Sequence, residues 1–186
     1  MALSAFLLLL ILGVFYSTGA LKKHSPDSVR INKKSNETRL GNPDDQYKIS
    51  VVTWNLAEKS PSKEDCSFLK KFKNDDIVVI GAQECEDVRP RREEGHRSRA
   101  WKLLQSAALG KSYSCLAQHR MGGLQISVYV KKSVASVIQG TQILDVACGV
   151  GNVLTNKGAI CVLIRIKGKT LALINAHLAA HVGKVI

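Results

Sequence analysis

The sequence lacks the paired cysteine spacing that zinc sites and redox motifs use. Its cysteines are five in number, which is odd, and no two of them are separated by two residues. This pattern suggests neither a disulfide framework nor a zinc site. We therefore expect most of them to be small core residues. The five positions are Cys66, Cys85, Cys115, Cys148 and Cys161.

Acidic residues are scarce relative to basic ones. The 186 residues include 15 Asp and Glu against 27 Lys and Arg, so the formal net charge is +12, with a sequence pI of about 9.7. Such a chain favours polyanionic partners, either a phosphoinositide membrane or a nucleic acid, and charge alone does not choose between them. With 45% apolar and 23% charged residues and no internal repeat, the composition is that of one globular domain.

The amino-terminal segment has no basic residue before its apolar run. The run extends from Leu3 to Phe15 and then turns small and polar, as a secretory signal peptide does before cleavage. Lys22 and Lys23 follow at once, and under the positive-inside rule an uncleaved segment would act as a signal anchor and leave the rest of the chain in the cytoplasm. Both readings of residues 1–21 stay open. In either case we expect this segment to lie outside the fold.

Residues 22–46 show no period that would bury one face, and we predict a basic polar linker there. Its basic residues either hold it near an anionic bilayer, each contributing about 1 kcal/mol close to the surface, or belong to a solvated tail. We expect a membrane-associated protein whose folded part faces the cytoplasm. A secreted or lumenal protein is the alternative after signal cleavage, and only then would the glycosylation sequon at Asn36 matter.

The folded part is predicted to begin at Tyr47. A β-branched segment at 47–55 predicts a strand, and the continuous apolar run at 76–84 predicts a strand covered on both faces. Helix between strands, followed by a meander of strands, predicts a mixed α/β layered fold and not a simple doubly wound sheet. Helices are expected at 64–73 and 101–109, and further strands at 113–118, 124–130, 133–146 with a break at Gly140, 159–166 and 170–178.

Polar side chains stand at the ends of three of these apolar strands. Asn55 follows VVTW, Glu84 follows VVIGAQ, and Asn175 and His177 lie in LALINAHL. Sheets place ligands at strand ends, and the two-residue period of a strand puts Asn175 and His177 on one face. A carboxylate beside an amide oxygen suits Mg²⁺, and a histidine can donate to a phosphoryl oxygen. Three of these residues also have an ordinary structural explanation. Asn55 would cap a turn, Glu84 would be a solvated strand end, and His177 would be a satisfied core histidine.

An arginine-rich loop, DVRPRREEGHRSRAW, follows Glu84 directly. Arg91 within it is a candidate for binding substrate phosphate. The alternative is a solvated loop that Glu93 and Glu94 partly neutralise.

Four short motifs resemble, in order and spacing, those of the inositol polyphosphate 5-phosphatases. They are TWN at 53–55, DIVVIGAQE at 76–84, NKG at 156–158 and NAHLAAH at 175–181. These enzymes belong to the endonuclease/exonuclease/phosphatase superfamily, which includes deoxyribonuclease I. TWN and QE are shared across that superfamily, whereas NKG followed by HLAAH is specific to its phosphoinositide branch. The resemblance implies that residues 47–186 are the amino-terminal portion of a catalytic domain, a deoxyribonuclease I-like layered α/β sandwich that is incomplete at its carboxyl end.

The resemblance also implies a role for each matching residue. Glu84 would bind a catalytic Mg²⁺, Asn55 would lie in the metal and phosphate shell, and His177 would contact the scissile phosphate. Lys157 is placed to meet substrate phosphates as a flexible point charge, in a loop that Asn156 shapes. We accordingly predict His177 and Asn55 as catalytic residues, Glu84 and Asn55 as metal ligands, and Asn156, Lys157, Arg91 and Asn175 as substrate-binding residues.

The chain departs from the family pattern in one large way. It stops at Ile186, before a Gly-Asp-x-Asn with the water-orienting acid, a Trp-Cys-Asp-Arg that grips substrate and a terminal Asp-His pair. Positioning and electrostatic terms supply most phosphoryl-transfer catalysis, so we expect a fragment or truncated product with little activity. The predicted function is Mg²⁺-dependent removal of the 5-phosphate from phosphoinositides or inositol polyphosphates. A superfamily nuclease, against which HLAAH argues, and a membrane-tethered binding module without turnover are the alternatives.

Overall fold

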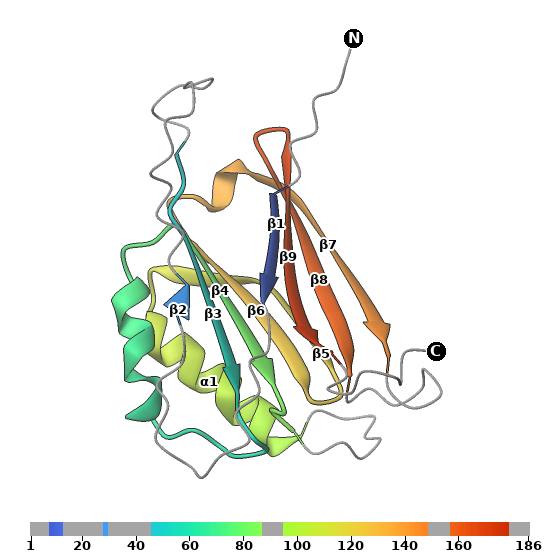
Figure 1. Cartoon of the computed structure of the whole chain (residues 1–186). Helices are drawn as coiled ribbons and strands as arrows, with labels where there is room; N and C mark the ends of the chain where they lie inside the picture. The colour runs from blue at the N-terminus through green and yellow to red at the C-terminus, as the bar shows by residue number, and fades with distance from the viewer. Residues whose placement is uncertain (1–7, 13–27, 30–45, 87–94, 149–156, 179–186) are drawn as a thin grey trace.

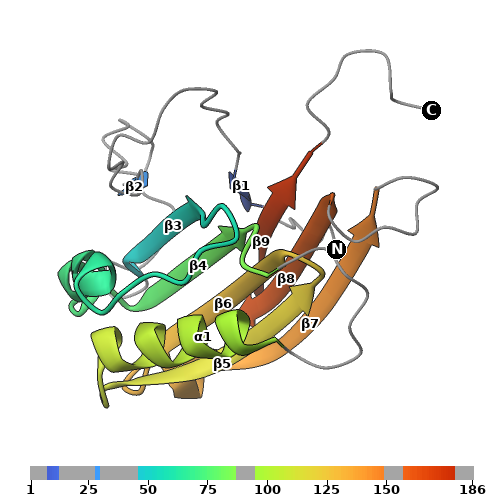
Figure 2. The same ribbon diagram turned by 90° about the horizontal axis from the view of Figure 1, so that it is seen from below.

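The computed structural model describes residues 8–12, 28–29, 46–86, 95–148 and 157–178. Within these residues two β-sheets pack face to face, and two helical segments cover the outer side of one of them (Figures 1 and 2). The fold is therefore a layered α/β sandwich, as predicted. In chain order the elements are β1 (Leu8–Leu12), β2 (Ser28–Val29), β3 (Ile49–Asn55), the 3₁₀ helix η2 (Asp65–Phe72), β4 (Ile77–Gln83), α1 (His96–Leu109), β5 (Tyr113–Met121), β6 (Leu124–Lys131), η3 (Ala135–Val137), β7 (Ile138–Ala147), β8 (Gly158–Ile166) and β9 (Lys169–His177).

The five-stranded sheet has the order β2-β3-β4-β6-β5, with β4 at its centre. The chain passes through η2 between β3 and β4, which run parallel, whereas β4 with β6 and β5 with β6 are antiparallel. All seven residues of β4 are buried. The apolar run at 76–84 is thus confirmed as a strand covered on both faces, by the helices on one side and by the second sheet on the other.

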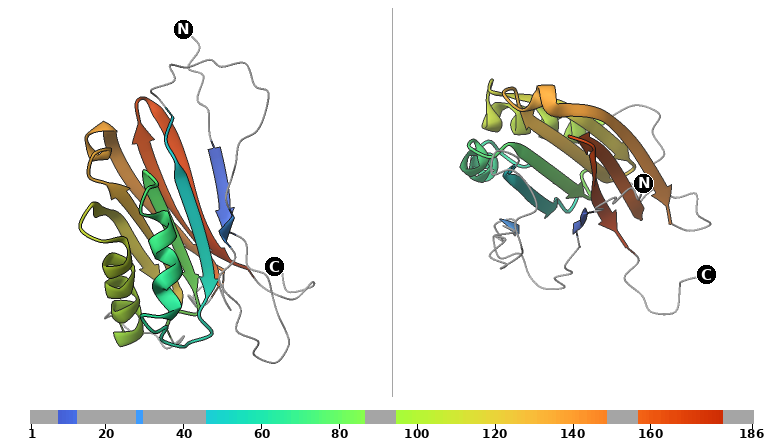
Figure 3. Two further views of the ribbon diagram at one scale, coloured as in Figure 1. Left: turned by 90° about the vertical axis from the view of Figure 1, so that its left-hand side faces the viewer. Right: turned by 90° about the horizontal axis from the view of Figure 1, so that it is seen from above.

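The four-stranded sheet has the order β1-β9-β8-β7 (Figure 3). β8 and β9 form a hairpin through Lys167 and Gly168, whose φ angles are 45° and 76°. Positive φ at both central residues is the signature of a type I′ turn, which matches the right-handed twist of the two strands. This short turn sets the register of the hairpin, so the last residue of β9 lies beside the first residue of β8.

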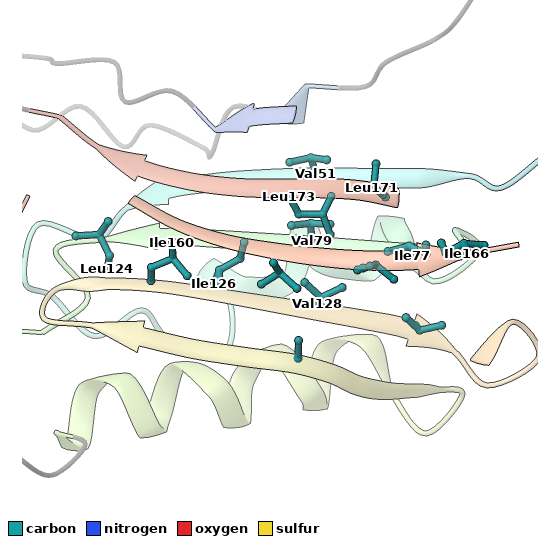
Figure 4. Packing of buried hydrophobic residues seen from close by; sticks show 14 of the residues in the cluster. Val51, Ile77, Val79, Leu124, Ile126, Val128, Ile160, Ile166, Leu171 and Leu173 are labelled. Atoms are coloured by element: carbon teal, nitrogen blue, oxygen red, sulfur yellow. The ribbon is translucent and has the colours of Figure 1, made fainter. Parts of the chain in front are cut away.

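Aliphatic side chains from both sheets fill the space between them (Figure 4). Val79 and Ile126 come from the five-stranded sheet, Ile160 and Leu173 from the four-stranded sheet, and none of them is more than 1% exposed. Each such side chain contributes about 1.5–3 kcal/mol when fully buried. The two sheets are therefore held together mainly by the hydrophobic effect.

A second cluster lies between the five-stranded sheet and the helical segments. The Trp54 ring meets Phe68 of η2 and Trp101 of α1 edge to face, with centroid distances of 5.9 and 5.7 Å. This geometry is a favoured one for aromatic pairs. It fixes both helical segments against the end of β3.

The structure differs from the expected elements mainly at three places. Residues 65–72 form a 3₁₀ helix, and α1 begins at His96, earlier than the predicted 101. The strand expected from 133 begins at Ile138 after a short 3₁₀ turn, and its register shifts between Ile138 and Gly140, close to the predicted break. The physical reason is that apolar periodicity marks which residues are buried, and it does not mark where a helix or strand ends.

The expectation that residues 1–46 lie outside the fold is corrected at two points. Residues 8–12 form β1, which pairs in parallel with residues 171–175 of β9, and β2 pairs with residues 51 and 52 of β3. The reason is that β9 and β3 each have an edge whose N–H and C=O groups accept another strand, and an extended apolar segment fits such an edge. The signal or anchor role of residues 1–21 and the linker role of residues 22–46 stay predictions. No helix in the described part of the chain is long and apolar enough to cross a membrane.

Replacing Gly158 by alanine should destabilise the fold by about 3 kcal/mol, because a Cβ there is both crowded and conformationally strained. The φ angle of Gly158 is 147°, and an added Cβ would lie 2.1 Å from the Val146 carbonyl oxygen. Gly140→Ala is the matched control on the paired strand, since nothing lies within 4 Å of its added Cβ. Urea unfolding followed by circular dichroism measures both variants. Equal midpoints for the two would contradict the crowding at Gly158.

Candidate active site at one end of the sandwich

The predicted site residues that the structure describes come together where strand ends meet. β3 and β4 are parallel and in register through Asn55 and Gln83, so Asn55 and the following Glu84 leave the sheet side by side. In the other sheet the first residue of β8 pairs with His177, the last residue of β9. The same pairing brings Lys157, which directly precedes β8, next to His177.

Three polar side chains at the ends of separate strands converge here: Glu84 after β4, Lys157 before β8 and His177 at the end of β9. His177 Nε2 lies 3.7 Å from Glu84 Oε1 and contacts Lys157 Nζ. The side chain of His177 is 1% exposed, whereas that of Glu84 is 35% exposed. The histidine therefore lies below the surface of the site, and the carboxylate reaches solvent. The prediction that Glu84, Lys157 and His177 share one site agrees with these contacts, and their catalytic roles stay predictions.

The surroundings of His177 favour the neutral form of its imidazole. Burial lowers its pKa below the ordinary value of 6.5, the charge of Lys157 lowers the pKa further, and Glu84 opposes both. A neutral ring offers one N–H donor and one acceptor nitrogen. Its Nδ1 is buried without a hydrogen-bond partner among the described residues.

The side chain of Asn55 caps a turn. Its Oδ1 accepts a hydrogen bond from the Ala57 N–H at 2.9 Å, and the next residue, Leu56, donates its N–H to the Gln83 carbonyl at 2.8 Å. The turn cap that the sequence analysis gave as the structural explanation for Asn55 is thus observed. An amide oxygen has two lone pairs, so this bond leaves capacity for a further ligand. The metal and catalytic roles of Asn55 stay predictions.

Asn175 joins the two sheets. Its Nδ2 donates to the carbonyls of Ala82 and Gln125 at 2.9 Å each, and its Oδ1 accepts from Gln83 Nε2 at 2.5 Å. The residue is fully buried. It shares the inward face of β9 with His177, as the two-residue period predicts, but both of its amide hydrogens are already bonded within the protein. Its observed contacts are structural, and substrate contact by Asn175 stays a prediction.

Two of the predicted substrate-binding residues, Asn156 and Arg91, lie outside the described residues.

Sequence reasoning missed the part played by Gln83. Its amide bonds to Asn175 across the sheets and also donates to Thr53 Oγ1 at 3.0 Å within its own sheet. The available signal was an amide at the end of an otherwise apolar run, since a buried amide requires partners. Glu86, a buried acid two residues after the partly exposed Glu84, was also missed.

The donors for a hard cation at this site are few. Among the described residues no group of three or more His, Cys, Asp or Glu side chains is arranged to hold a metal. Glu84 supplies one partly exposed carboxylate, and Asn55 supplies an amide oxygen on the neighbouring strand. Mg²⁺ is usually held by one or two carboxylates, with water and substrate phosphate completing its shell. The oxygen donors of Glu84 and Asn55 therefore fit a hard divalent cation such as Mg²⁺.

Residues 52–185 match the family model described as Endonuclease/Exonuclease/phosphatase family 2. The chain belongs to this family. The matched range includes Asn55, Glu84, Lys157 and His177, the residues that meet at the end of the sandwich. The resemblance inferred from the short motifs is thereby confirmed.

Two relatives of this chain are named as 5-phosphatases. Type II inositol polyphosphate 5-phosphatase 14 of Arabidopsis thaliana is 30% identical over 159 residues, which cover 76% of this chain and 14% of that protein. Phosphatidylinositol 4,5-bisphosphate 5-phosphatase A of Homo sapiens is 28% identical, covering 76% of this chain and 15% of that protein. The chain thus spans about a seventh of the length of these curated relatives.

Two solved structures share the fold of this chain. The inositol polyphosphate 5-phosphatase domain of SPsynaptojanin, in complex with inositol (1,4)-bisphosphate and calcium, has a TM-score of 0.58 at 24% identity and covers 75% of this chain and 42% of that one. A Cimex nitrophorin in a ferrous NO complex has a TM-score of 0.57 at 14% identity, covering 74% and 49%. The predicted deoxyribonuclease I-like sandwich is confirmed. Because one fold accommodates such different ligands, function must be argued from the site.

Asn175→Ala should destabilise the protein by about 3 kcal/mol, because two carbonyls and the Gln83 amide lose their buried partner. Gln142→Ala on the exposed strand β7 is the control and should change stability by no more than about 0.5 kcal/mol. Both are measured by urea unfolding. A cost for Asn175→Ala no larger than that of the control would show that the amide bridge does not hold the sheets together.

The lowered pKa of His177 predicts a loss of stability in acid. The unfolded histidine binds a proton near pH 6.5 and the folded one only at lower pH, so folding stability should fall as the pH drops below about 6.5 toward the folded pKa. His177→Gln should flatten this part of the stability profile. Urea unfolding between pH 7.5 and pH 5 in EDTA, for both proteins, gives the two slopes. Parallel profiles would contradict a buried neutral imidazole.

Proposed function

We propose that this chain carries the cation- and phosphate-contacting part of a Mg²⁺-dependent phosphatase, one that removes the 5-phosphate from inositol polyphosphates or phosphoinositides. The observation that carries the proposal is the convergence of Glu84, Lys157 and His177 from separate strands at one end of the sandwich. The substrate class is supported by the names of the relatives, which are inositol polyphosphate and phosphatidylinositol 5-phosphatases.

The cationic side of the site is suited to a phosphate ester. Lys157 places its ammonium group against the imidazole of His177, and the chain as a whole has a formal charge of +12. A positive field of this kind raises the local concentration of an anionic substrate. The same charge supports placement at an anionic membrane surface that faces the cytoplasm, where phosphoinositide head groups are expected.

Glu84 and Asn55 would hold the cation. Both donors are hard oxygen atoms at the ends of neighbouring parallel strands, and Glu84 is open to solvent on one side. Bound there, Mg²⁺ would polarise the phosphoryl oxygens and neutralise charge that develops during transfer. His177 and Lys157 would act on the substrate through their positions and charge.

His177 and Lys157 would contact the phosphoryl group itself. If the Lys157 ammonium that contacts His177 Nε2 moved onto a substrate phosphate, Nε2 would be left to donate an N–H to a phosphoryl oxygen. The burial of the imidazole would keep that hydrogen bond in a low-dielectric setting, where it is stronger than in water. Lys157 adds a positive charge from its position directly before β8. Asn175 and Gln83 keep the two sheets at a fixed spacing, so these donors do not shift relative to Glu84.

The test is titration calorimetry of the purified chain with inositol 1,4,5-trisphosphate, in Mg²⁺ and in EDTA. We expect Mg²⁺ to strengthen binding in the wild type but not in Glu84→Gln, and Lys157→Ala to weaken binding about tenfold, or 1.4 kcal/mol. Lys169→Ala is the control, because Lys169 is an exposed cation at the other end of β9 from His177.

Equal losses for Lys157→Ala and Lys169→Ala would point to non-specific attraction and would contradict the proposed site. Phosphate release is measured in the same samples, where release from the 5-position that requires Mg²⁺ and Glu84 is the enzymatic result. Plasmid nicking without phosphate release would favour the nuclease alternative, and binding without turnover would favour the binding module.

A further inference from the structure

The described residues that follow β4 include a second acid, which has no part in the contacts described so far. Glu86 follows Glu84 by two residues and is 2% exposed. Its Oε2 accepts a hydrogen bond from the Ser98 N–H at 3.3 Å, and its Oε1 lies 3.9 Å from Arg97 Nε. A carboxylate is buried only at a large desolvation cost unless it is paired. These partners therefore specify where Glu86 must lie.

Helix α1 obtains its amino-terminal anion from Glu86. The N-cap residue is Gly95, which has no capping side chain, and the first turn of the helix contains no acid. A carboxylate at this end satisfies a free N–H group and complements the helix dipole. The approach is close, because a Cβ added to Gly95 would lie 1.9 Å from Glu86 Oε2. A Cβ at position 95 would displace the Glu86 carboxylate, whereas the φ angle of −67° itself suits any residue.

Glu84 needs an anchor of this kind because its backbone adopts an unfavourable conformation. Its φ angle is 51°, in the left-handed region that residues with a Cβ avoid. On one side Glu58 donates its N–H to the Glu84 carbonyl at 2.8 Å, and on the other Cys85 donates its N–H to the Gly123 carbonyl at 2.9 Å. The Cys85 side chain is fully buried. Glu86 continues this series of contacts from the strand end to the helix.

We propose that Glu86 is a positioning residue, which anchors residues 84–86 to the amino terminus of α1 and thereby holds Glu84 where its carboxylate reaches His177 and a divalent cation. The inference rests on the proposed cation-binding role of Glu84. A positioning role for Glu86 differs from simple helix capping in one respect. If Glu86 only capped the helix, its replacement would leave the backbone at residues 84 and 85 unchanged.

The first experiment is independent of any cation. Amide hydrogen exchange of the 186-residue chain is followed by NMR for the wild type, Glu86→Gln and Glu86→Ala, and corrected for the change in global stability. We expect the Cys85 and Glu58 amides to exchange about tenfold faster in Glu86→Ala, with a smaller change in Glu86→Gln, while amides in the middle of β4 keep their protection.

Asp75→Asn is the matched control for this experiment. Asp75 is a buried carboxylate, 1% exposed, that pairs with Lys48 and lies before the opposite end of β4. Its replacement should leave the Cys85 and Glu58 amides unchanged. Unchanged exchange at these two amides in both Glu86 variants would overturn the proposal and leave Glu86 as a helix cap.

The second experiment measures the cation directly, by electron paramagnetic resonance titration with Mn²⁺. We expect Glu84→Gln to lose the site, Glu86→Ala to bind about tenfold more weakly than the wild type, and Asp75→Asn to bind normally. If Glu86→Ala bound Mn²⁺ with wild-type affinity while Glu84→Gln lost Mn²⁺ binding, the positioning role of Glu86 would be overturned. If the wild type binds no Mn²⁺, the proposed cation role of Glu84 fails, and the exchange experiment still decides whether Glu86 holds the Glu84 backbone.

A third variant disturbs the contact without removing the acid. Gly95→Ala should push the Glu86 carboxylate away and speed exchange at Cys85, but it should have no such effect in a Glu86→Ala background, where the added methyl group has room. An effect of equal size in both backgrounds would contradict the proposed contact.

Discussion

Two sheets that touch only through aliphatic side chains have no strong preference for one relative position, because the hydrophobic effect is non-directional. In this protein the buried amide of Asn175 removes that freedom. It bonds to carbonyls of β4 and β6 and to the Gln83 side chain, so sliding one sheet along the other would leave several buried polar groups unpaired. His177 follows two residues later on the same strand. Its position opposite Glu84 is therefore a consequence of the Asn175 bridge.

The strands of the domain could be predicted from the sequence because their signal is local. A continuous apolar run made β4 recognisable, and apolar segments did the same for β8 and β9. Pairing between distant segments carries no such signal. The pairing of β1 with β9 and of β2 with β3 depends on which strand edges the completed sheets leave available, and no pattern within residues 8–12 or 28–29 reveals it.

The candidate site shows the same division between local and distant information. Glu84 and His177 could be found because each is a polar residue at the end of an apolar strand. Their separation of 3.7 Å could not, since it depends on how β4 and β9 lie in two different sheets. Gln83 and Glu86 escaped notice for a related reason: their partners, Asn175 and the amino terminus of α1, are brought to them only by the tertiary fold.

The left-handed backbone of Glu84 places two selective pressures in opposition at one position. Glycine or asparagine would relax the backbone there, whereas only an acid supplies the carboxylate. A screen that rewarded thermal stability alone would therefore be expected to replace Glu84, and a screen that rewarded function would retain it. The position would then report which property a population of variants had been selected for.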